Sequence, residues 1–169
     1  TKGEIMSGIL GLVTKDGPHV IERDLESMAA PLCRLPIHQI ESHASQTAGL
    51  AVVRLTNETA IARQRNTWLA VTGMVVQQDE LRTSLHAAGC DTRAATQAEL
   101  LLELYLTFGL DALTNLNGSY ALAIWEETPR RLTLVRDRLG MANLYYGLSG
   151  GRLMFASEYK AITWHPDFG

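Results

Sequence analysis

The sequence predicts an α+β fold in which helices cover a meander of strands. Residues 120–125 are apolar on both alternating faces, which is typical of a strand covered on both sides. Further apolar runs follow at 132–135, 144–147 and 153–156, and the last two are joined by Ser149-Gly150-Gly151. A Gly-rich pair between apolar runs indicates a hairpin. Strands of this kind need helices packed over them, and the chain has amphipathic segments that can supply these helices.

Two segments predict core helices. Thr96 and Glu99 have the Thr-x-x-Glu spacing of a capping box, and the apolar face that follows ends at Gly109. A second helix is expected to begin near Asp79 and to stop at Gly89. Residues 24–46 are the least regular stretch, with two prolines and mixed polarity, and we expect part helix and part loop there.

Composition excludes several classes of protein. The 169 residues suit one domain, with 46% hydrophobic and 20% charged residues. The net charge of −3 and the lack of a basic stripe argue against nucleic acid as a partner. No apolar run approaches the ~20 residues of a membrane helix, so no membrane partner is expected. Cys33 and Cys90 lack metal-like spacing, which favours free thiols in a reducing compartment, the cytoplasm. The five histidines are scattered singly, so we expect no metal site.

Four blocks carry a resemblance to a known family. They occur in order as Leu116-Asn117-Gly118, Arg136-Asp137-Arg138-Leu139-Gly140, Leu144-Tyr145-Tyr146 and Phe155-Ala156-Ser157-Glu158-Tyr159-Lys160-Ala161. Together they resemble the amidotransferase domain of asparagine synthetases, a class II glutamine amidotransferase, over most of the chain from Met6 to Ile162. The resemblance implies a four-layer αββα sandwich of the N-terminal-nucleophile hydrolase type. We expect Asp137 and Glu158 to be polar groups that hold this fold together.

The resemblance also divides the chain. Residues 1–6 are expected to be a leader or an expression remnant, residues 7–162 the amidotransferase-like domain, and residues 163–169 the start of a linker to a synthetase domain. Members of the family that have such a domain carry a Ser-Gly-Gly-x-Asp-Ser phosphate loop in it. Ser149-Gly150-Gly151 lacks the Asp-Ser and is interpreted as a hairpin turn.

The motif Met6-Ser7-Gly8-Ile9-Leu10-Gly11 resembles the family's Met-Cys-Gly-Ile-x-Gly. In the family the Met is removed, and the exposed Cys is both N-terminus and nucleophile, with its α-amine as base. Here Ser7 takes the place of the Cys. A hydroxyl is much less acidic than a thiol and depends more on a placed base. Ser7 is therefore a degenerate nucleophile position, although serine serves as N-terminal nucleophile in other branches of the fold, and an engineered change stays open.

The other expected pocket positions are mostly altered. Arg54 matches the arginine that holds the glutamine α-carboxylate, although a surface or ion-paired arginine is equally open. Thr72 and Gly73 take the oxyanion-hole positions, where the family has Asn-Gly, and only Gly73 is kept. Met74 replaces a Glu that contacts substrate, and Gln97 replaces the Asp that binds the glutamine α-amine. The loss of one oxyanion donor typically costs ~10²–10³ in rate.

We therefore expect a domain that no longer hydrolyses glutamine and that structurally supports an asparagine-synthetase-like, ATP-dependent amide-forming enzyme. The altered glutamine pocket resembles the degraded pockets of β-lactam synthetase, carbapenam synthetase and lasso-peptide cyclases. No cofactor is expected in this domain, and the resemblance implies ATP and Mg²⁺ in the synthetase. The partner is a C-terminal or separate synthetase domain, a homodimer stays open, and glutamine binds only if the pocket still works. Two alternatives remain: an active glutaminase that uses Ser7 to supply ammonia, and a free-standing binding module.

Overall fold

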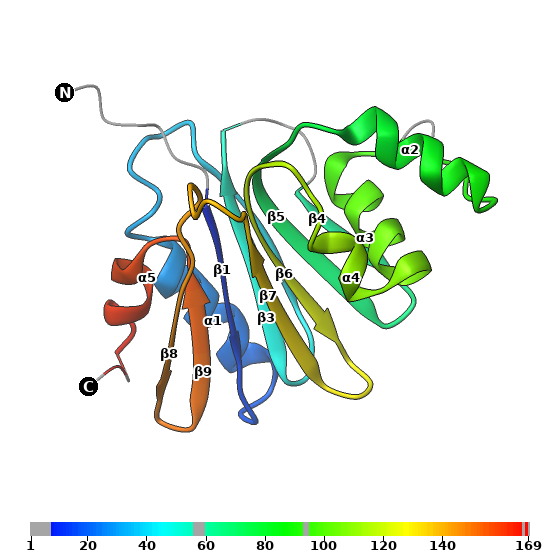
Figure 1. Ribbon diagram of the computed structural model, residues 1–169. Coiled ribbons are helices and arrows are strands. Elements are labelled where there is room, and N and C mark those ends of the chain that lie inside the picture. The colour runs from blue at the N-terminus through cyan, green and yellow to red at the C-terminus, as the bar shows by residue number, and fades with distance from the viewer. Residues whose placement is uncertain (1–7, 56–59, 93–94, 167, 169) are drawn as a thin grey trace. The chain divides into compact units, whose positions relative to one another are not determined.

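The computed structural model describes residues 8–55, 60–92, 95–166 and 168, which divide into two compact units (Figure 1). Unit 1 comprises Thr1–Asn57 and Asn143–Gly169, and unit 2 comprises Glu58–Ala142. Each unit combines one antiparallel sheet with helices and has its own hydrophobic core. The predicted α+β class is therefore confirmed in both units.

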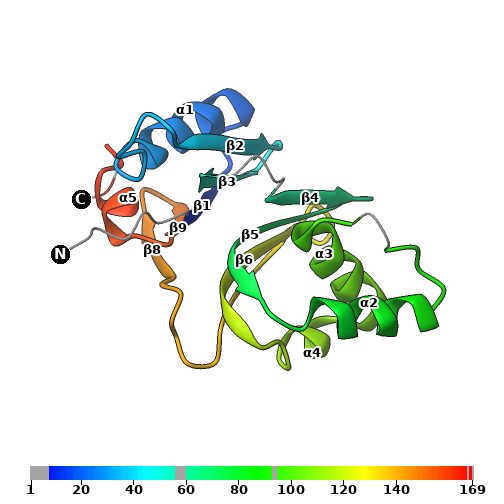
Figure 2. The same cartoon turned by 90° about the horizontal axis from the view of Figure 1, so that it is seen from above.

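Unit 1 contains a five-stranded sheet, sheet A, in the order β2-β3-β1-β9-β8. Its strands and helices are β1 (Gly8–Val13), α1 (Pro18–Ala29), β2 (Gln39–Ala44), β3 (Ala48–Arg54), β8 (Tyr145–Ser149), β9 (Arg152–Ala156) and α5 (Tyr159–Thr163). Strand β1 lies at the centre, paired with β3 on one side and with β9 on the other. Figure 2 shows α1 and α5 on the same face of this sheet, where Ile21, Met28 and Ile162 belong to one buried cluster with Leu10 and Met154.

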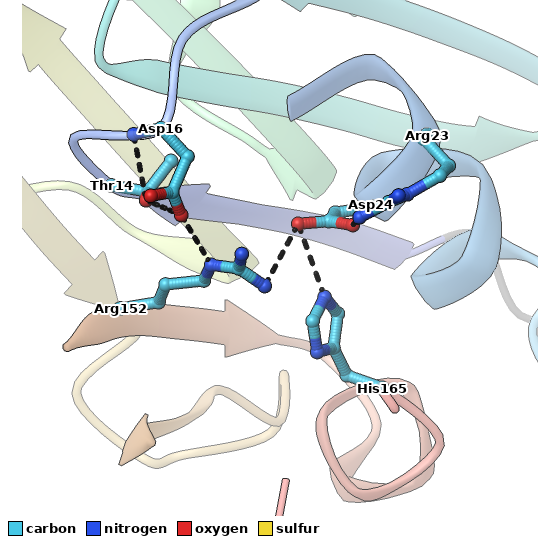
Figure 3. A network of polar contacts seen from close by, with 6 residues as sticks. All are labelled: Thr14, Asp16, Arg23, Asp24, Arg152 and His165. Carbon is cyan, nitrogen blue, oxygen red and sulfur yellow. Dashed lines mark hydrogen bonds and ion pairs between the residues drawn. The ribbon is translucent and has the colours of Figure 1, made fainter. Parts of the chain in front are cut away.

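A buried ion-pair network joins the two chain segments of unit 1 (Figure 3). Asp24 of α1 has a side chain that is only 3% exposed, and its Oδ2 lies 3.3 Å from Nη1 of Arg152 and 3.3 Å from Nε2 of His165. Arg152 begins β9, and His165 follows α5. Nε of Arg152 also donates to Oδ2 of Asp16 at 2.8 Å. Helix α1, the turn after β1, strand β9 and the segment after α5 are thus held at one point.

The outer part of this network is more exposed. Oδ1 of Asp24 accepts from Arg23, and Asp16 is held by Thr14, whose hydroxyl donates to Oδ2 at 2.7 Å. The Thr14 hydroxyl and then Arg152 hold the pKa of Asp16 below its usual range. Because His165 is buried against Asp24, at least one residue of the stretch expected to begin a linker is anchored in unit 1.

Unit 2 contains a four-stranded sheet, sheet B, in the order β4-β5-β6-β7. Its strands and helices are β4 (Ile61–Gln64), β5 (Thr67–Val75), α2 (Gln78–Ala87), α3 (Gln97–Phe108), α4 (Leu110–Leu113), β6 (Gly118–Glu126) and β7 (Arg131–Arg136). Leu100, Leu101 and Leu104 of α3 pack with Leu69 and Leu122 in one buried cluster. Helix α3 begins with the predicted capping box, in which Thr96 accepts from the N–H of Glu99 and the Glu99 carboxylate accepts from the N–H of Thr96.

Most predicted elements are present, with ends that differ by one or two residues. Strands β6, β7, β8 and β9 correspond to the expected apolar runs, and α2 and α3 to the expected helices. Strand β2 is an element that the sequence reading missed within the stretch 24–46. It lies at an edge of sheet A and has no buried residue, so it lacks a strong apolar alternation.

Among the described residues, no helix is long and apolar enough to cross a membrane.

Candidate functional site

Strand β5 carries three of the predicted pocket residues at one end. Thr72 is buried, Gly73 has a φ of 84°, and Met74 is 62% exposed. A Cβ at Gly73 would fall 2.1 Å from the carbonyl oxygen of Ser119 on the paired strand β6. Because only glycine fits this left-handed conformation and this close approach, Gly73 is required by the backbone path itself.

Gln97 lies beside this strand end, at the first residue of α3. Its side-chain oxygen accepts from the N–H of Val75 at 2.8 Å and from Nε2 of Gln78 at 3.1 Å. Its side-chain nitrogen donates to the carbonyl oxygen of Gly73 at 3.0 Å. The structure therefore brings Gln97 together with Gly73 and its neighbours, and the Gln97 amide binds main chain with both of its ends.

These contacts decide what the position of Gln97 can do chemically. An ammonium group needs an acceptor, and it gains most from a charged one. Gln97 carries no charge, and its oxygen already accepts two hydrogen bonds. The side chain therefore acts as a brace between α3, the end of β5 and the start of α2.

Arg54 lies in unit 1, at the end of β3. Its Nε is 3.3 Å from Oε2 of Glu41 on the neighbouring strand β2, and both side chains are about one-fifth exposed. This contact supports the interpretation of Arg54 as an ion-paired residue, with Glu41 as its partner. Its role in binding a substrate carboxylate stays a prediction.

Ser7 lies outside the described residues, but the strand that follows it is well defined. Ile9 of β1 donates its N–H to Oγ of Ser157 at 3.0 Å, and the N–H of Ser157 donates to the carbonyl oxygen of Ile9 at 2.8 Å. Ser157 is buried and clamps the beginning of β1. Sequence reasoning gave Ser157 no role, although it stands in the Phe155-Ala156-Ser157-Glu158 block that carried the resemblance.

Asp137 and Glu158, the two polar residues predicted to hold the fold, both have partners within the chain. The Asp137 carboxylate accepts from the N–H of Met141 at 2.9 Å and of Ala142 at 2.8 Å. Burial would raise the pKa of Asp137, but these N–H groups and the nearby Arg136 lower it overall. Glu158 forms an ion pair with Arg34.

A cavity of about 630 Å³ lies in unit 2 between β4 and the start of α3. Arg63, Glu99 and Glu103 are among its lining residues, and Thr72, Gly73, Met74 and Gln97 are not among those described. Glu99 is already bound in the capping box. Over the described residues, no group of three or more His, Cys, Asp or Glu side chains is placed to hold a metal ion.

Residues 6–169 match the sequence profile of the glutamine amidotransferase domain. The chain belongs to this family, and the resemblance seen in the four sequence blocks is confirmed.

Two curated relatives are asparagine synthetases of Bacillus subtilis. Asparagine synthetase [glutamine-hydrolyzing] 3 is 37% identical over 95 residues, which cover 56% of this chain and 16% of that protein. Asparagine synthetase [glutamine-hydrolyzing] 2 is 27% identical over 171 residues, which cover 95% of this chain and 23% of that protein. The chain therefore spans less than a quarter of the length of either relative.

Among solved structures, glutamine phosphoribosylpyrophosphate amidotransferase from B. subtilis, complexed with ADP and GMP, is similar to this chain with a TM-score of 0.69 and 19% identity. The match covers 92% of this chain and 42% of that one. At this level of identity the likeness concerns the fold alone. It confirms the expected fold class, an α+β fold of the N-terminal-nucleophile type.

Proposed function

We propose that this chain is the glutamine amidotransferase-like domain of an asparagine-synthetase-like, ATP-dependent amide-forming enzyme, and that it does not hydrolyse glutamine. The synthetase partner, on the same or a separate chain, binds ATP and Mg²⁺ and activates a carboxylate. An amine already present on the substrate then closes the amide, so no ammonia is needed. The amidotransferase-like domain supports that partner structurally.

The observation that carries this proposal is the bonding of Gln97. The family uses an Asp here for the ammonium group of glutamine, whereas this chain has a neutral amide bound to the backbone around Gly73. If glutamine bound here, its ammonium group would meet no charge at this position and would have to displace an internal hydrogen bond. Val75 is buried, and leaving a buried N–H group unpaired costs about 1–3 kcal/mol.

The neighbouring replacements support the same conclusion. Thr72 is buried and cannot supply the amide N–H that an Asn side chain offers to an oxyanion. Met74 presents an apolar side chain where the family has a carboxylate. Ser7 replaces a thiol by a far less acidic hydroxyl. These changes affect separate steps of glutamine hydrolysis, namely binding, oxyanion stabilisation and nucleophilic attack.

The alternative is an active glutaminase with Ser7 as nucleophile. Two retained residues favour it: Gly73, which keeps a backbone N–H at the oxyanion position, and Arg54, which keeps a guanidinium for the substrate carboxylate. In that case ammonia would pass to the synthetase.

A glutamate-release assay separates the two functions. The chain is prepared with Ser7 as its first residue, so that a free α-amine is present, and is compared with a Ser7→Ala variant prepared in the same way. We expect both to release glutamate at the background rate. Release by the Ser7 protein that the Ser7→Ala variant lacks would establish the glutaminase and overturn the proposal.

A restored variant makes the negative result informative. It combines Ser7→Cys, Thr72→Asn, Met74→Glu and Gln97→Asp, and Ser7→Cys alone is its control. We expect measurable hydrolysis only in the combined variant, because a thiolate without an oxyanion hole and an ammonium partner lacks most of the machinery.

A further inference from the structure

Strand β8 is an edge strand that lacks the usual protection. The four edges of the two sheets are β2 and β8 in sheet A, and β4 and β7 in sheet B. Three of these strands carry charged residues, with Glu41 in β2, Arg63 in β4 and Arg131 and Arg136 in β7. In contrast, residues 143–151, which include all of β8, carry no charge. Charged side chains on an edge strand discourage pairing with another chain, so their absence here is informative.

The same strand exposes large apolar side chains. Tyr146 is 73% exposed and Leu148 is 76% exposed. A Cβ at Gly147 would meet Phe168 and Ile162, so Gly147 points to the face of sheet A that α5 covers. Side chains alternate along a strand, and Tyr146 and Leu148 therefore share the opposite face. We call the outer side of β8 with these two side chains the β8 edge.

The backbone of the β8 edge is oriented for pairing. Gly150 and Gly151 both have positive φ and form the two-residue turn of the β8–β9 hairpin, with Ser149 opposite Arg152. In such a hairpin the residues that close the turn are hydrogen-bonded to each other, and bonded and non-bonded pairs then alternate. The N–H and C=O groups of Tyr146 and Leu148 consequently point away from β9. Figure 1 shows β8 as the outermost strand beside β9, and no other described strand pairs with it.

We propose that the β8 edge binds the β8 edge of a second copy of this chain, as an antiparallel strand pair centred on Gly147. In this register Tyr146 of each copy lies opposite Leu148 of the other, and the two residues exchange both backbone hydrogen bonds. Aromatic and aliphatic side chains directly opposite each other stabilise antiparallel pairs. With no charged residue in either strand, the pair meets no like-charge repulsion. The β8 edge is thus complementary to itself, and sheet A continues across the dimer.

This interaction is independent of whether the domain hydrolyses glutamine, so its test is separate from the glutamate-release assay. Sedimentation velocity of the full chain over a range of concentrations is the first measurement, and we expect a monomer–dimer equilibrium. Leu148→Lys places a buried ammonium group opposite Tyr146 of the second copy, and we expect it to raise the dissociation constant at least about tenfold. Leu139→Lys is the matched control, because Leu139 is 83% exposed but lies in a loop outside both sheets.

Disulfide cross-linking tests the register without relying on affinity. Cys33 and Cys90 are first replaced by Ser, and then a Tyr146→Cys chain is mixed with a Leu148→Cys chain. The proposed register brings these two positions directly opposite, within the reach of a disulfide. We expect more cross-linked product from the mixture than from either chain alone.

Three results would overturn the proposal. The first is a chain that stays monomeric at all concentrations. The second is a dimer that Leu148→Lys and Leu139→Lys affect equally. The third is a monomer whose Tyr146 and Leu148 amides are nevertheless strongly protected from hydrogen exchange in the complete enzyme, which would mean that an extended segment of a synthetase partner covers the β8 edge in place of a second copy.

Discussion

At the first residue of α3, Gln97 combines a donor and an acceptor in one side chain. The donor binds the carbonyl oxygen of Gly73, and the acceptor binds the N–H of Val75. A carboxylate offers only acceptors and could satisfy one of these two groups, not both. A local hydrogen-bonding requirement therefore accounts for an amide at this position, independently of any substrate.

We predict that Gln97→Glu destabilises the chain by about 1–3 kcal/mol at neutral pH. The substitution removes a donor and sets a carboxylate oxygen against the carbonyl oxygen of Gly73. Because the folded chain disfavours the carboxylate, the pKa of the glutamic acid is raised there, so the loss of stability should shrink as the pH falls through that raised value and be smallest below the unfolded value of about 4.3. Urea unfolding at several pH values measures both effects.

Gln64→Glu is the control for this substitution, because Gln64 is an exposed glutamine in the same unit. A surface change of this kind is usually within about 0.5 kcal/mol of neutral. Equal destabilisation by the two substitutions, or a loss at Gln97 that does not change with pH, would contradict the bracing role.

At the residue scale, the role of the candidate site residues in binding glutamine stays a prediction, and their hydrogen bonds could not be read from the sequence. The blocks around Thr72, Gly73, Met74 and Gln97 placed these residues near one another, and the structure brings them to one end of β5. The bond from Gln97 to Gly73 could not be predicted, because it depends on how α3 packs against β5. Ser157 was missed for a similar reason, since its partner Ile9 is 148 residues away in the sequence.

At the scale of elements, the loop after β7 is ordered by one side chain. Asp137 accepts from the N–H groups of Met141 and Ala142, and its own N–H and carbonyl oxygen bind Tyr120 and Gly140. The loop can therefore turn sharply at the end of the strand without leaving these backbone groups unpaired.

We predict that Asp137→Asn destabilises the chain by about 1–3 kcal/mol at neutral pH, because an Asn oxygen can satisfy one N–H while its NH₂ group opposes the other. The pKa of Asp137 is lowered in the folded chain. Its contribution to stability is therefore present above the unfolded value of about 3.9 and is lost as the pH falls through the lower folded value. Wild type and variant should thus converge in acid, which urea midpoints from pH 7 downward can measure.

Asp111→Asn provides the comparison, since Asp111 is an exposed aspartate in the same unit. If the difference in stability between wild type and Asp137→Asn stayed constant as the pH fell, the charge of the Asp137 carboxylate would not be the cause of the stabilisation.

Elements differed in how well the sequence predicted them. Strand β6 was predicted because it is almost fully buried and therefore apolar on both faces, and helix α3 because a capping box precedes its buried apolar face. The sequence did not separate the end of helix α1 from strand β2, because α1 has no side-chain cap and β2 has no buried residue. Propensity alone decides little where packing against a neighbouring element supplies the stability.

At the scale of the whole molecule, the buried ion-pair network around Asp24 joins the two chain segments of unit 1, which unit 2 separates in the sequence. Asp24 comes from the first segment of unit 1, and Arg152 and His165 come from the second. Removing one member of a buried ion pair leaves an uncompensated charge in the interior.

We predict that Asp24→Asn lowers the free energy of unfolding by about 3 kcal/mol, because Arg152 and His165 lose their shared carboxylate. Urea unfolding followed by tryptophan fluorescence provides the measurement. Glu22→Gln, at an exposed position on the same helix, should change stability by less than about 0.5 kcal/mol. If Asp24→Asn had an equally small effect, the network would contribute little to holding the two segments together.

The central place of β1 in sheet A has a consequence for biosynthesis. Strand β1 is synthesised before the other strands of sheet A and can hydrogen-bond with β3 soon afterwards, but its other neighbour, β9, ends only at Ala156. During translation, one side of β1 therefore stays unpaired until β9 has been made. Unit 2 is continuous in sequence and can form its own sheet in the meantime. The slow, aggregation-prone step of folding should thus be the closure of sheet A by late-arriving strands, which is the kind of non-local pairing that chaperones protect.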